Sequence, residues 1–329
     1  MTQKNNIAIV GAGSLKGEAF IARLAEAEVD VGEVFLLDNE AMAGEHVEFG
    51  RRDKRVLLAS DFDFSQVQYV ICLGEAALTE QLYPALEAGG CAVIDASGYL
   101  GQRQDVSLAT LQADDVAPRV VAIPETTTLQ LWLVLQPLLQ ETAITELHVS
   151  VLQCAAQGGK ALLEDLGQQT ARLLGFQEAQ PAQLGKQLAF NVIPQVGALD
   201  AQGESSSEAM IRDQIARLFV LPRTEVDVTM LWSPVFYGDT VTASVRLRDA
   251  LAMEYMETHW QANPLLAYAA NQVVTPVSDA SGKSVISLSR VRAWQTADEH
   301  GLVTFCSVVD PTQLSAMICI LVLQNQLLV

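Results

Sequence analysis

Three threonines stand where an apolar stretch meets a leucine-rich segment, in VVAIPETTTLQLWLVLQPLL at residues 120–139. A strand that enters a helix in this way directs the first free backbone N–H groups, and the side chain among them, to one point. A thiol there is drawn toward its thiolate, whereas a threonine hydroxyl is a nucleophile only beside a dedicated base. We expect the Thr126 hydroxyl to cap a backbone N–H, with Glu125 favourable near the positive end of the helix dipole.

A second constellation with chemistry is a glycine loop near the N-terminus. IAIVGAGSLKGEAF reads as strand, loop and helix, and its G-x-G-x-x-x-G spacing is one residue longer than the common dinucleotide fingerprint. Gly11 permits the tight turn, Gly13 the close approach of a pyrophosphate, and Gly17 the packing of helix on strand. The predicted cofactor-binding residues of this region are Gly11, Gly13, Ser14, Leu15, Gly17, Asp38 and Gly74.

The acid at the end of the second predicted strand decides the expected cofactor. Asp38 lies about where a carboxylate bonds the ribose hydroxyls of a dinucleotide, and Glu40 follows it. Two carboxylates there would repel the 2′-phosphate of NADP, so we predict NAD rather than NADP. The alternative is a tight turn and a surface acid that bind no nucleotide.

Charge and composition limit the possible partners. The chain has 329 residues, is 50% hydrophobic and carries a formal charge of −19. A field of that sign repels nucleic acid and anionic membrane surfaces, so neither is an expected partner. The apolar last stretch, residues 314–329, is short and interrupted by Gln-Asn-Gln, which favours a buried closing helix over a membrane span.

Cysteine and histidine usage indicates a reducing compartment and no metal. The five cysteines lie in apolar runs without a CxxC pair, and the four histidines are scattered without metal-ligand spacing. Buried reduced thiols, together with an N-terminus that has no signal-peptide pattern, predict a cytoplasmic protein.

The periodicity predicts two domains. Short apolar runs alternate with helical patterns over roughly the first 125 residues, which is typical of a doubly wound parallel sheet of the Rossmann type. Longer strands rich in β-branched residues follow, with the pattern of an antiparallel sheet. We predict strands at 6–10, 33–38, 55–60, 67–74, 91–97 and 119–124 and then at 144–156, 225–236, 240–250, 284–294 and 302–310.

Helices are predicted at 18–30, 160–176 and 205–219, the last with Glu208 following a serine cluster as a plausible cap. The predicted boundaries are 1–127 with a C-terminal helix 315–329 for the NAD-binding Rossmann domain, and 128–314 for an α+β domain.

Several separated motifs together resemble the aspartate-semialdehyde dehydrogenase family. They are the glycine loop, VIDASGYL, AIPETTTLQ, VSVLQCAAQGG, SPVFYGD and SVVDPTQLSAM, in that order along the chain. The resemblance implies a Rossmann domain, an α+β domain whose antiparallel sheet forms a homodimer interface, and a C-terminal helix that returns to the first domain. It also implies the reversible phosphorylating oxidation of a semialdehyde with a nicotinamide cofactor.

The catalytic positions of that family are not matched. Where its members carry A-N-P-N-C-S-T, this chain has Thr126 at the cysteine. Where they carry R-V-P-V-F-Y-G-H, Trp232 replaces the substrate-binding arginine and Asp239 the histidine base. Gln153, which matches the glutamine that orients the substrate, and Gly158, near where the nicotinamide would lie, are retained.

The family's phosphate-binding residues also differ. Leu100 follows DASGY where an arginine is usual, with Arg103 as a possible substitute. Ile211 or Arg212 stands where a helix usually supplies a lysine.

Several of these positions have two interpretations. Cys154 is expected in the core, with a relocated nucleophile as the alternative. Asp239 is either a loop residue that caps a turn or a base whose pKa burial must raise. Trp232 either fills the substrate pocket or lines a pocket for an uncharged ligand.

Three functions therefore stay open at this point. The first is an oxidoreductase that transfers hydride directly between the cofactor and an unidentified carbonyl substrate, without the thioester. The second is an NAD-binding module without turnover, and the third is a structural partner of an active relative.

Overall fold

The computed structural model describes residues 5–27, 29–111 and 118–328, which form two compact units. Unit 1 consists of residues 1–125 and 315–329, and unit 2 of residues 126–314. The division predicted after residue 127 lies two residues from this boundary. The ends of the chain, residues 1–4 and Val329, belong to the predicted Rossmann domain but lie outside the described residues.

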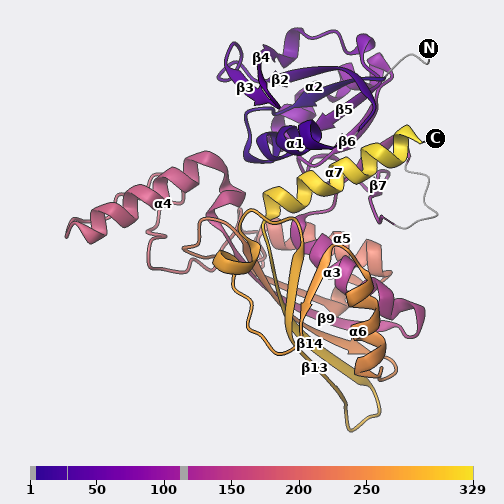
Figure 1. Cartoon of the computed structure of the whole chain (residues 1–329). Helices are drawn as coiled ribbons and strands as arrows, with labels where there is room; N and C mark the ends of the chain where they lie inside the picture. Colours follow the sequence, from indigo (N-terminus) through magenta and orange to yellow (C-terminus); the bar gives the residue numbers. More distant parts are fainter. Residues whose placement is uncertain (1–4, 28, 112–117, 329) are drawn as a thin grey trace. The chain divides into compact units, whose positions relative to one another are not determined.

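Unit 1 contains an eight-stranded sheet in the order β3-β4-β2-β1-β5-β6-β8-β7 (Figure 1). All six predicted strands are present. The edge strands β3 and β7 were not predicted, and β3 pairs antiparallel with β4 while the other strands are parallel. The strands are β1 Asn5–Val10, β2 Val31–Asp38, β3 His46–Phe49, β4 Arg52–Leu58, β5 Tyr69–Cys72, β6 Ala92–Asp95, β7 Ser107–Leu108 and β8 Val120–Ala122.

The order of these strands creates a switch point between β1 and β5. From β1 the chain passes through α1 (Leu15–Glu26) to β2 on one side, whereas β5 and β6 extend the sheet on the other. Open α/β sheets bind ligands at the carboxyl ends of the strands beside such a point. The sheet thus places the predicted glycine loop, which follows β1, at that edge.

Helix α1 buries most of the apolar face that its helical spacing predicts, although Ala25 of the same face is exposed. Phe20, Ile21 and Leu24 of α1 are buried, as their spacing indicated. The closing helix α7 (Pro311–Leu327) begins in unit 2 and continues into unit 1, where the hydroxyl of Tyr69 donates to the carbonyl of Gln326 at 3.2 Å. The other helical segments of the unit are α2 Ala76–Gly89, η1 Ala59–Asp61, η2 Phe64–Gln66 and η3 Leu100–Gln102.

Unit 2 contains a six-stranded sheet in the order β10-β9-β11-β14-β13-β12. The prediction of an antiparallel sheet is wrong at both edges, because β10 pairs parallel with β9 and β12 parallel with β13. Parallel neighbours need a crossover connection, and helices α4 and α5 supply one between β9 and β10. The strands are β9 Ile144–Gln153, β10 Val226–Trp232, β11 Asp239–Leu247, β12 Leu266–Ala269, β13 Ile286–Gln295 and β14 Gly301–Val309.

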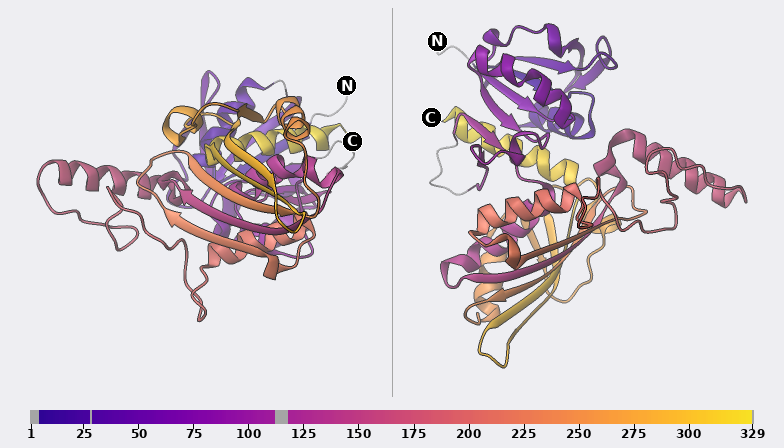
Figure 2. Two further views of the ribbon diagram at one scale, coloured as in Figure 1. Left: turned by 90° about the horizontal axis from the view of Figure 1, so that it is seen from below. Right: turned by 180° about the vertical axis from the view of Figure 1, so that it is seen from behind.

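One face of this sheet carries helices. Figures 1 and 2 show α3, α5 and α6 on the same face, while α4 projects away from the sheet. The capping box of α5 is confirmed, since Ser205 and Glu208 exchange side-chain and backbone hydrogen bonds. The helical segments are α3 Thr126–Leu135, α4 Gly159–Leu174, α5 Ser206–Phe219, α6 Met253–Ala262, η4 Gln136–Gln140, η5 Ala155–Gly158, η6 Arg223–Glu225 and the π-helical η7 Pro276–Ala280.

Side chains in the middle of β9 alternate between the two faces of this sheet. Val149 and Val151 of β9 are buried, whereas His148 and Ser150 between them are exposed. The second face therefore presents polar and small residues, so the sheet buries one apolar side only.

Within the part of the chain that the structure describes, no helix is long and apolar enough to cross a membrane.

Replacing Gly11 with Ala is expected to destabilise unit 1 strongly. Gly11 has φ +82°, and an added Cβ would lie 2.2 Å from the backbone nitrogen of Gly74. A left-handed φ alone costs a side-chain-bearing residue about 1–2 kcal/mol, and the overlap with rigid backbone adds to that. Calorimetric Tm values of the wild type and the variant provide the measurement.

The matched control is Gly50→Ala. Gly50 also has a positive φ, +64°, but a Cβ there would meet only the Cβ of Ala25 at 3.7 Å, an ordinary contact. The control should therefore show the backbone cost alone. Equal Tm losses in both variants would contradict the close approach of Gly11 to Gly74.

Candidate functional site

The loop after β1 is shaped by contacts that exclude side chains. A Cβ at Gly17 would lie 2.1 Å from the carbonyl oxygen of Gly11, and one at Gly13 would lie 2.4 Å from Cε of Met42. Gly11 and Gly74 bring the loops after β1 and β5 together as described above. The three glycines of the motif are buried and leave no room for a side chain, and such close packing of backbone is what a dinucleotide-binding loop requires.

Ser14 closes this loop as the N-cap of α1. Its hydroxyl accepts from the N–H of Gly17 at 2.9 Å and donates to the carbonyl of Leu73 at 2.9 Å. The loop is thereby tied both to the helix and to the segment after β5. Leu15, the first residue of α1, is half-buried and follows directly.

The carboxylate of Asp38 is turned toward the glycine loop. It accepts from the N–H of Gly13 at 2.8 Å through one oxygen and from the N–H of Asn39 at 2.8 Å through the other. Each carboxylate oxygen has a second lone pair, so these bonds leave acceptor capacity for a ribose hydroxyl. The side chain of Met42, which the sequence did not single out, packs over Gly13 beside this carboxylate.

The turn after β6 is organised by a second buried carboxylate. Asp95 accepts from the N–H and hydroxyl of Ser97 and from the N–H of Leu100, at 2.9, 2.5 and 2.7 Å. Burial raises the pKa of Asp95, whereas these hydrogen bonds and the charge of Lys16 act in the opposite direction. Asp95 thus shapes the DASGYL turn.

The predicted substitutes for phosphate-binding residues already have partners. Arg103 binds both oxygens of Asp105, at 3.1 and 2.7 Å, and its guanidinium lies 5.2 Å from the ring centroid of Tyr83. In unit 2, Ile211 is buried and Arg212 is paired with Glu204.

Unit 2 brings Gln153, Trp232 and Asp239 to one end of its sheet. Gln153 and Trp232 are register partners at the ends of β9 and β10. Asp239 begins the neighbouring strand β11, whose next residue pairs with Leu152. These three predicted positions therefore lie together, although 85 residues separate Cys154, next to Gln153, from Asp239.

A loop that follows Trp232 holds this end of the sheet in place. The N–H and hydroxyl of Ser233 donate to the carbonyl of Gln153 at 2.9 and 3.1 Å. The N–H groups of Ala155 and Ala156 donate to the carbonyls of Val235 and Phe236. The backbone of Gln153 is thus fixed, while its side chain is 8% exposed.

Asp239 is an anchor for the loop after β9. It is fully buried, and its two oxygens accept from the N–H of Cys154 at 2.8 Å and from the amide of Gln157 at 2.9 Å. Burial raises the pKa of Asp239 to about 6, with the neighbouring carboxylate of Asp310 acting in the same direction and the hydrogen bonds in the opposite one. The role of Gln157 was not predicted from the sequence.

Cys154 is a core residue, as expected. It is fully buried, and burial raises the pKa of its thiol well above the usual value, with a further contribution from the charge of Asp239. A neutral, enclosed thiol does not act as a nucleophile at neutral pH.

Trp232 fills space in unit 2. Its side chain is buried, and its backbone forms a two-way bridge with Ile193 through hydrogen bonds of 2.9 and 3.1 Å. The indole is buried at the end of β10, and whether it fills or lines a substrate pocket stays a prediction.

Thr126 is the first residue of α3, a helix whose ten residues are all buried. In the described chain its hydroxyl makes neither the capping hydrogen bond that we expected nor a bond to Gln153 or Asp239. No base therefore contacts it.

Gly158 ends the loop that Asp239 holds. A Cβ on it would lie 2.4 Å from Cδ2 of Leu162, so the first turn of α4 packs directly on this backbone. The following Gly159 has φ +77° and open space around it.

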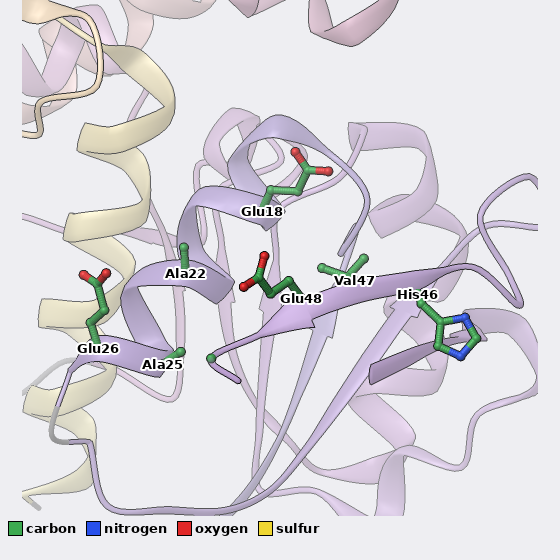
Figure 3. A pocket seen from close by; sticks show the side chains of 8 residues that line it. Glu18, Ala22, Ala25, Glu26, His46, Val47 and Glu48 are labelled. Atoms are coloured by element: carbon green, nitrogen blue, oxygen red, sulfur yellow. The ribbon is translucent and has the colours of Figure 1, made fainter. Parts of the chain in front are cut away.

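A groove elsewhere on unit 1 has the wrong charge for a dinucleotide. It has a volume of about 510 Å³ and lies between α1 and β3, where Glu18, Glu26 and Glu48 are among the residues that line it (Figure 3). Among the described residues, no group of three or more His, Cys, Asp or Glu could hold a metal ion.

Two family models match the chain. The semialdehyde dehydrogenase NAD binding domain matches residues 6–125, and the semialdehyde dehydrogenase dimerisation domain matches residues 135–312. Together the two models match most of both units. The first model describes an NAD binding domain, which agrees with the glycine loop of unit 1.

Proteins of known name resemble the chain over nearly its whole length. Aspartate-semialdehyde dehydrogenase 2 of Vibrio cholerae is 29% identical over 299 residues, 89% of each chain. The USG-1 protein homolog of Pseudomonas aeruginosa is 30% identical over 301 residues, 90% of each. The solved structure of aspartate semialdehyde dehydrogenase II from Vibrio cholerae, complexed with ASA, superposes with a TM-score of 0.92 at 26% identity and covers 99% of each chain. The chain therefore belongs to the semialdehyde dehydrogenase family.

Proposed function

We propose that this chain is an NAD-binding homodimer that has lost the thioester route of its family. The observation that carries the proposal is the state of the two candidate nucleophiles. Thr126 presents an alcohol without a base, and Cys154 is enclosed with a raised thiol pKa. A thioester cannot form on either group at a useful rate.

Hydride transfer without a covalent intermediate is still chemically possible. A bound nicotinamide would supply the hydride acceptor or donor, and the residues that would hold the dinucleotide are the glycine loop and Asp38. Gln153, with its backbone fixed by Ser233, is the retained group that could orient a carbonyl substrate. The substrate of such a reaction would be an aldehyde or ketone that needs no arginine clamp.

Asp239 is proposed as a structural anchor rather than a general base. A pKa of about 6 lies near the range in which a base operates, but geometry comes first. Both of its oxygens accept hydrogen bonds, and its side chain is fully buried, so it does not reach a substrate proton.

A binding module without turnover is the second candidate. It is favoured by the contrast between the two units: the backbone cradle for a dinucleotide is intact, whereas Trp232 and Asp239 are both engaged in the packing of unit 2. A panel of aldehydes and ketones assayed with NADH separates the candidates, because only the first predicts oxidation of NADH.

The proposal also includes that the chain forms a homodimer and that it works in the cytoplasm. The polar and small residues on the uncovered face of the unit 2 sheet, such as Ser150 and Thr242, provide a flat surface that a second copy can cover. The five free cysteines support a reducing, cytoplasmic environment.

NAD is expected to bind more tightly than NADP, by about tenfold or more, because Asp38 lies where the 2′-phosphate would approach. Titration calorimetry with both dinucleotides measures the ratio. Asp38→Asn keeps an acceptor for the N–H of Gly13 but removes the charge, and it should bring the two affinities closer. Glu33→Gln, at the start of β2, is the control and should leave the ratio unchanged. Tighter binding of NADP by the wild type would remove the role assigned to Asp38.

No acyl adduct should form at residue 126. The protein is mixed with aspartate semialdehyde and NAD without phosphate, and intact mass spectrometry then looks for the acyl group. Thr126→Cys is the matched variant, since it restores a thiol at the start of α3 and changes nothing else. An adduct in the variant alone would assign the loss to this one side chain, whereas an adduct on Thr126 of the wild type would overturn the proposal.

Asp239 should make folding stability fall as pH rises through about 4 to 6. Its pKa is about 6 when folded and about 3.9 when unfolded, so the folded state binds the extra proton in this window. Its stabilising effect is complete below pH ~4 and is lost above pH ~6, by up to about 3 kcal/mol. Asp239→Asn lacks this titration, so its stability relative to the wild type should increase over the window.

Urea unfolding of both proteins at a series of pH values gives this difference, in which the other titrating groups cancel. Asp227→Asn, at an exposed position of the same sheet, controls for the loss of one acidic residue. A constant difference between Asp239→Asn and the wild type would show that Asp239 is not buried as described.

A further inference from the structure

One row of side chains on the uncovered face of the unit 2 sheet has opposite charges at its two ends. The face lies away from α3, α5 and α6 (Figures 1 and 2). Register pairs across adjacent strands define the row, from β10 through β9, β11 and β14 to β13. Its members are Asp227, His148, Ser244, Thr304 and Arg292. The row thus begins with a carboxylate and ends with a guanidinium, and Ser244 of β11 lies at its centre.

Two polar groups of this row lack a partner within one copy of the chain. The guanidinium of Arg292 is exposed and forms no hydrogen bond or ion pair with another described residue. The hydroxyl of Thr304 is buried, yet it has no hydrogen-bond partner in the described chain. At the other end, the side chain of Asp227 is 70% exposed and lies 3.5 Å from the ring of His148. Groups of both charges are therefore available to a partner at this face.

The centre of the face allows a second surface to approach closely. The neighbouring row runs through Ser150 and Thr242, which are small and exposed. Arg246, the next residue of β11 on this face after Ser244, is paired with Glu146 and with Asp298, at 3.2 Å each. Because two carboxylates neutralise its charge within the chain, Arg246 does not repel a second copy at the centre.

Charge complementarity selects a second copy of the chain and its orientation. A two-fold axis between two sheets that pack face to face can run along the strands or across them. An axis along β11 lays the β10 side of one copy over the β13 side of the other, so each Asp227 meets the partner's Arg292. An axis across the strands lays each side over the same side of the partner and brings like charges together. The row is thus complementary to itself in one of these two orientations.

We propose that a second copy of this chain packs on the uncovered face about a two-fold axis parallel to β11, with an ion pair between Asp227 of each copy and Arg292 of the other. The inference rests on the homodimer of the proposed function and adds the residues that meet in it. Thr304 then lies opposite the partner's His148, so its buried hydroxyl gains a polar neighbour.

Cross-linking of single cysteines tests the position of the axis. A residue on the axis lies roughly 10 Å from its own copy, the spacing of packed sheets, whereas a residue two strands away lies roughly 20 Å from its copy. A bismaleimide that spans about 10 Å should therefore link Thr242→Cys and Ser244→Cys into covalent dimers. Thr229→Cys, exposed on β10, is the control and should stay unlinked. Linkage at Thr229, or at one of the two β11 positions alone, would contradict this axis.

These variants are made with Cys306→Ser, since Cys306 is half-buried whereas the other four cysteines are buried. The native thiols then do not compete for the reagent.

Reversal of one charge tests the ion pair. Arg292→Glu places two carboxylates at each of the two symmetric contacts, so the dissociation constant of the dimer should rise by about tenfold or more at low salt and by less at high salt. Asp227→Arg in the same chain restores opposite charges and should recover the dimer, which a merely structural role of either residue would not explain. Arg52→Glu, at an exposed position of β4 in unit 1, is the control. Sedimentation equilibrium at two salt concentrations gives the dissociation constants.

The outcomes separate this arrangement from the homodimer itself. Linkage along β11 together with rescue by the reversed pair supports the arrangement. If the wild type is dimeric but Arg292→Glu dissociates no more than Arg52→Glu, the arrangement is wrong while the homodimer stands. If the wild type sediments as a monomer, the proposed homodimer and this inference are both wrong.

Discussion

The contact between the backbones of Gly11 and Gly74 determines the form of the ligand-binding edge in unit 1. With only 2.2 Å available to a Cβ, the loops after β1 and β5 touch without side chains between them. Helix α1 must therefore begin directly beside this contact, with Ser14 as its cap and Asp38 bonded to the loop. These contacts use the N–H groups of Gly11, Ala12 and Gly13, which bond to Leu37 and Asp38.

Unit 2 depends in a comparable way on one buried carboxylate. Asp239 binds a backbone N–H and a side-chain amide of the loop after β9, and the hydrogen bonds offset part of the cost of burying its charge. The buried carboxylate of Asp239 is stabilised because both of its oxygens accept hydrogen bonds. On the proposed function, the same two hydrogen bonds keep Asp239 from exchanging a proton with a substrate.

The sequence reveals those parts of the fold that a local pattern encodes. The glycine loop, Asp38 and the Ser205 capping box lie within short segments, and their geometry follows from residues that are near in the chain. The strands β3, β7 and β12 have only two to four residues and lie at sheet edges, where partial exposure removes the apolar pattern. Helix α6 buries only Met256 and Trp260 of its ten residues, which is too few for a periodic signal.

Long-range contacts and the direction of strands cannot be predicted from local sequence patterns. Alternation of apolar and polar residues is the same in parallel and antiparallel strands, so the parallel edges of the unit 2 sheet had no signal. The bond between Gln157 and Asp239 joins residues 82 positions apart, and Met42 approaches Gly13 from a different loop. The family resemblance supplied the position of Asp239 but not its partners. Thr126 shows the opposite case, since its helix was predicted and the expected capping bond is missing.

Two of the positions that differ from the motifs of the family have structural partners in unit 2. Trp232 pairs through its backbone with Ile193 and is buried, and Asp239 holds the loop that contains Gln157. Dinucleotide binding uses backbone groups and charges of unit 1 that form no hydrogen bonds to these residues in the described chain. The thioester route, which we propose to be lost, needs a thiol, a base and a substrate clamp at the same time. On that proposal a cysteine at residue 126 would return the nucleophile, while the side chains of Trp232 and Asp239 would stay buried in unit 2.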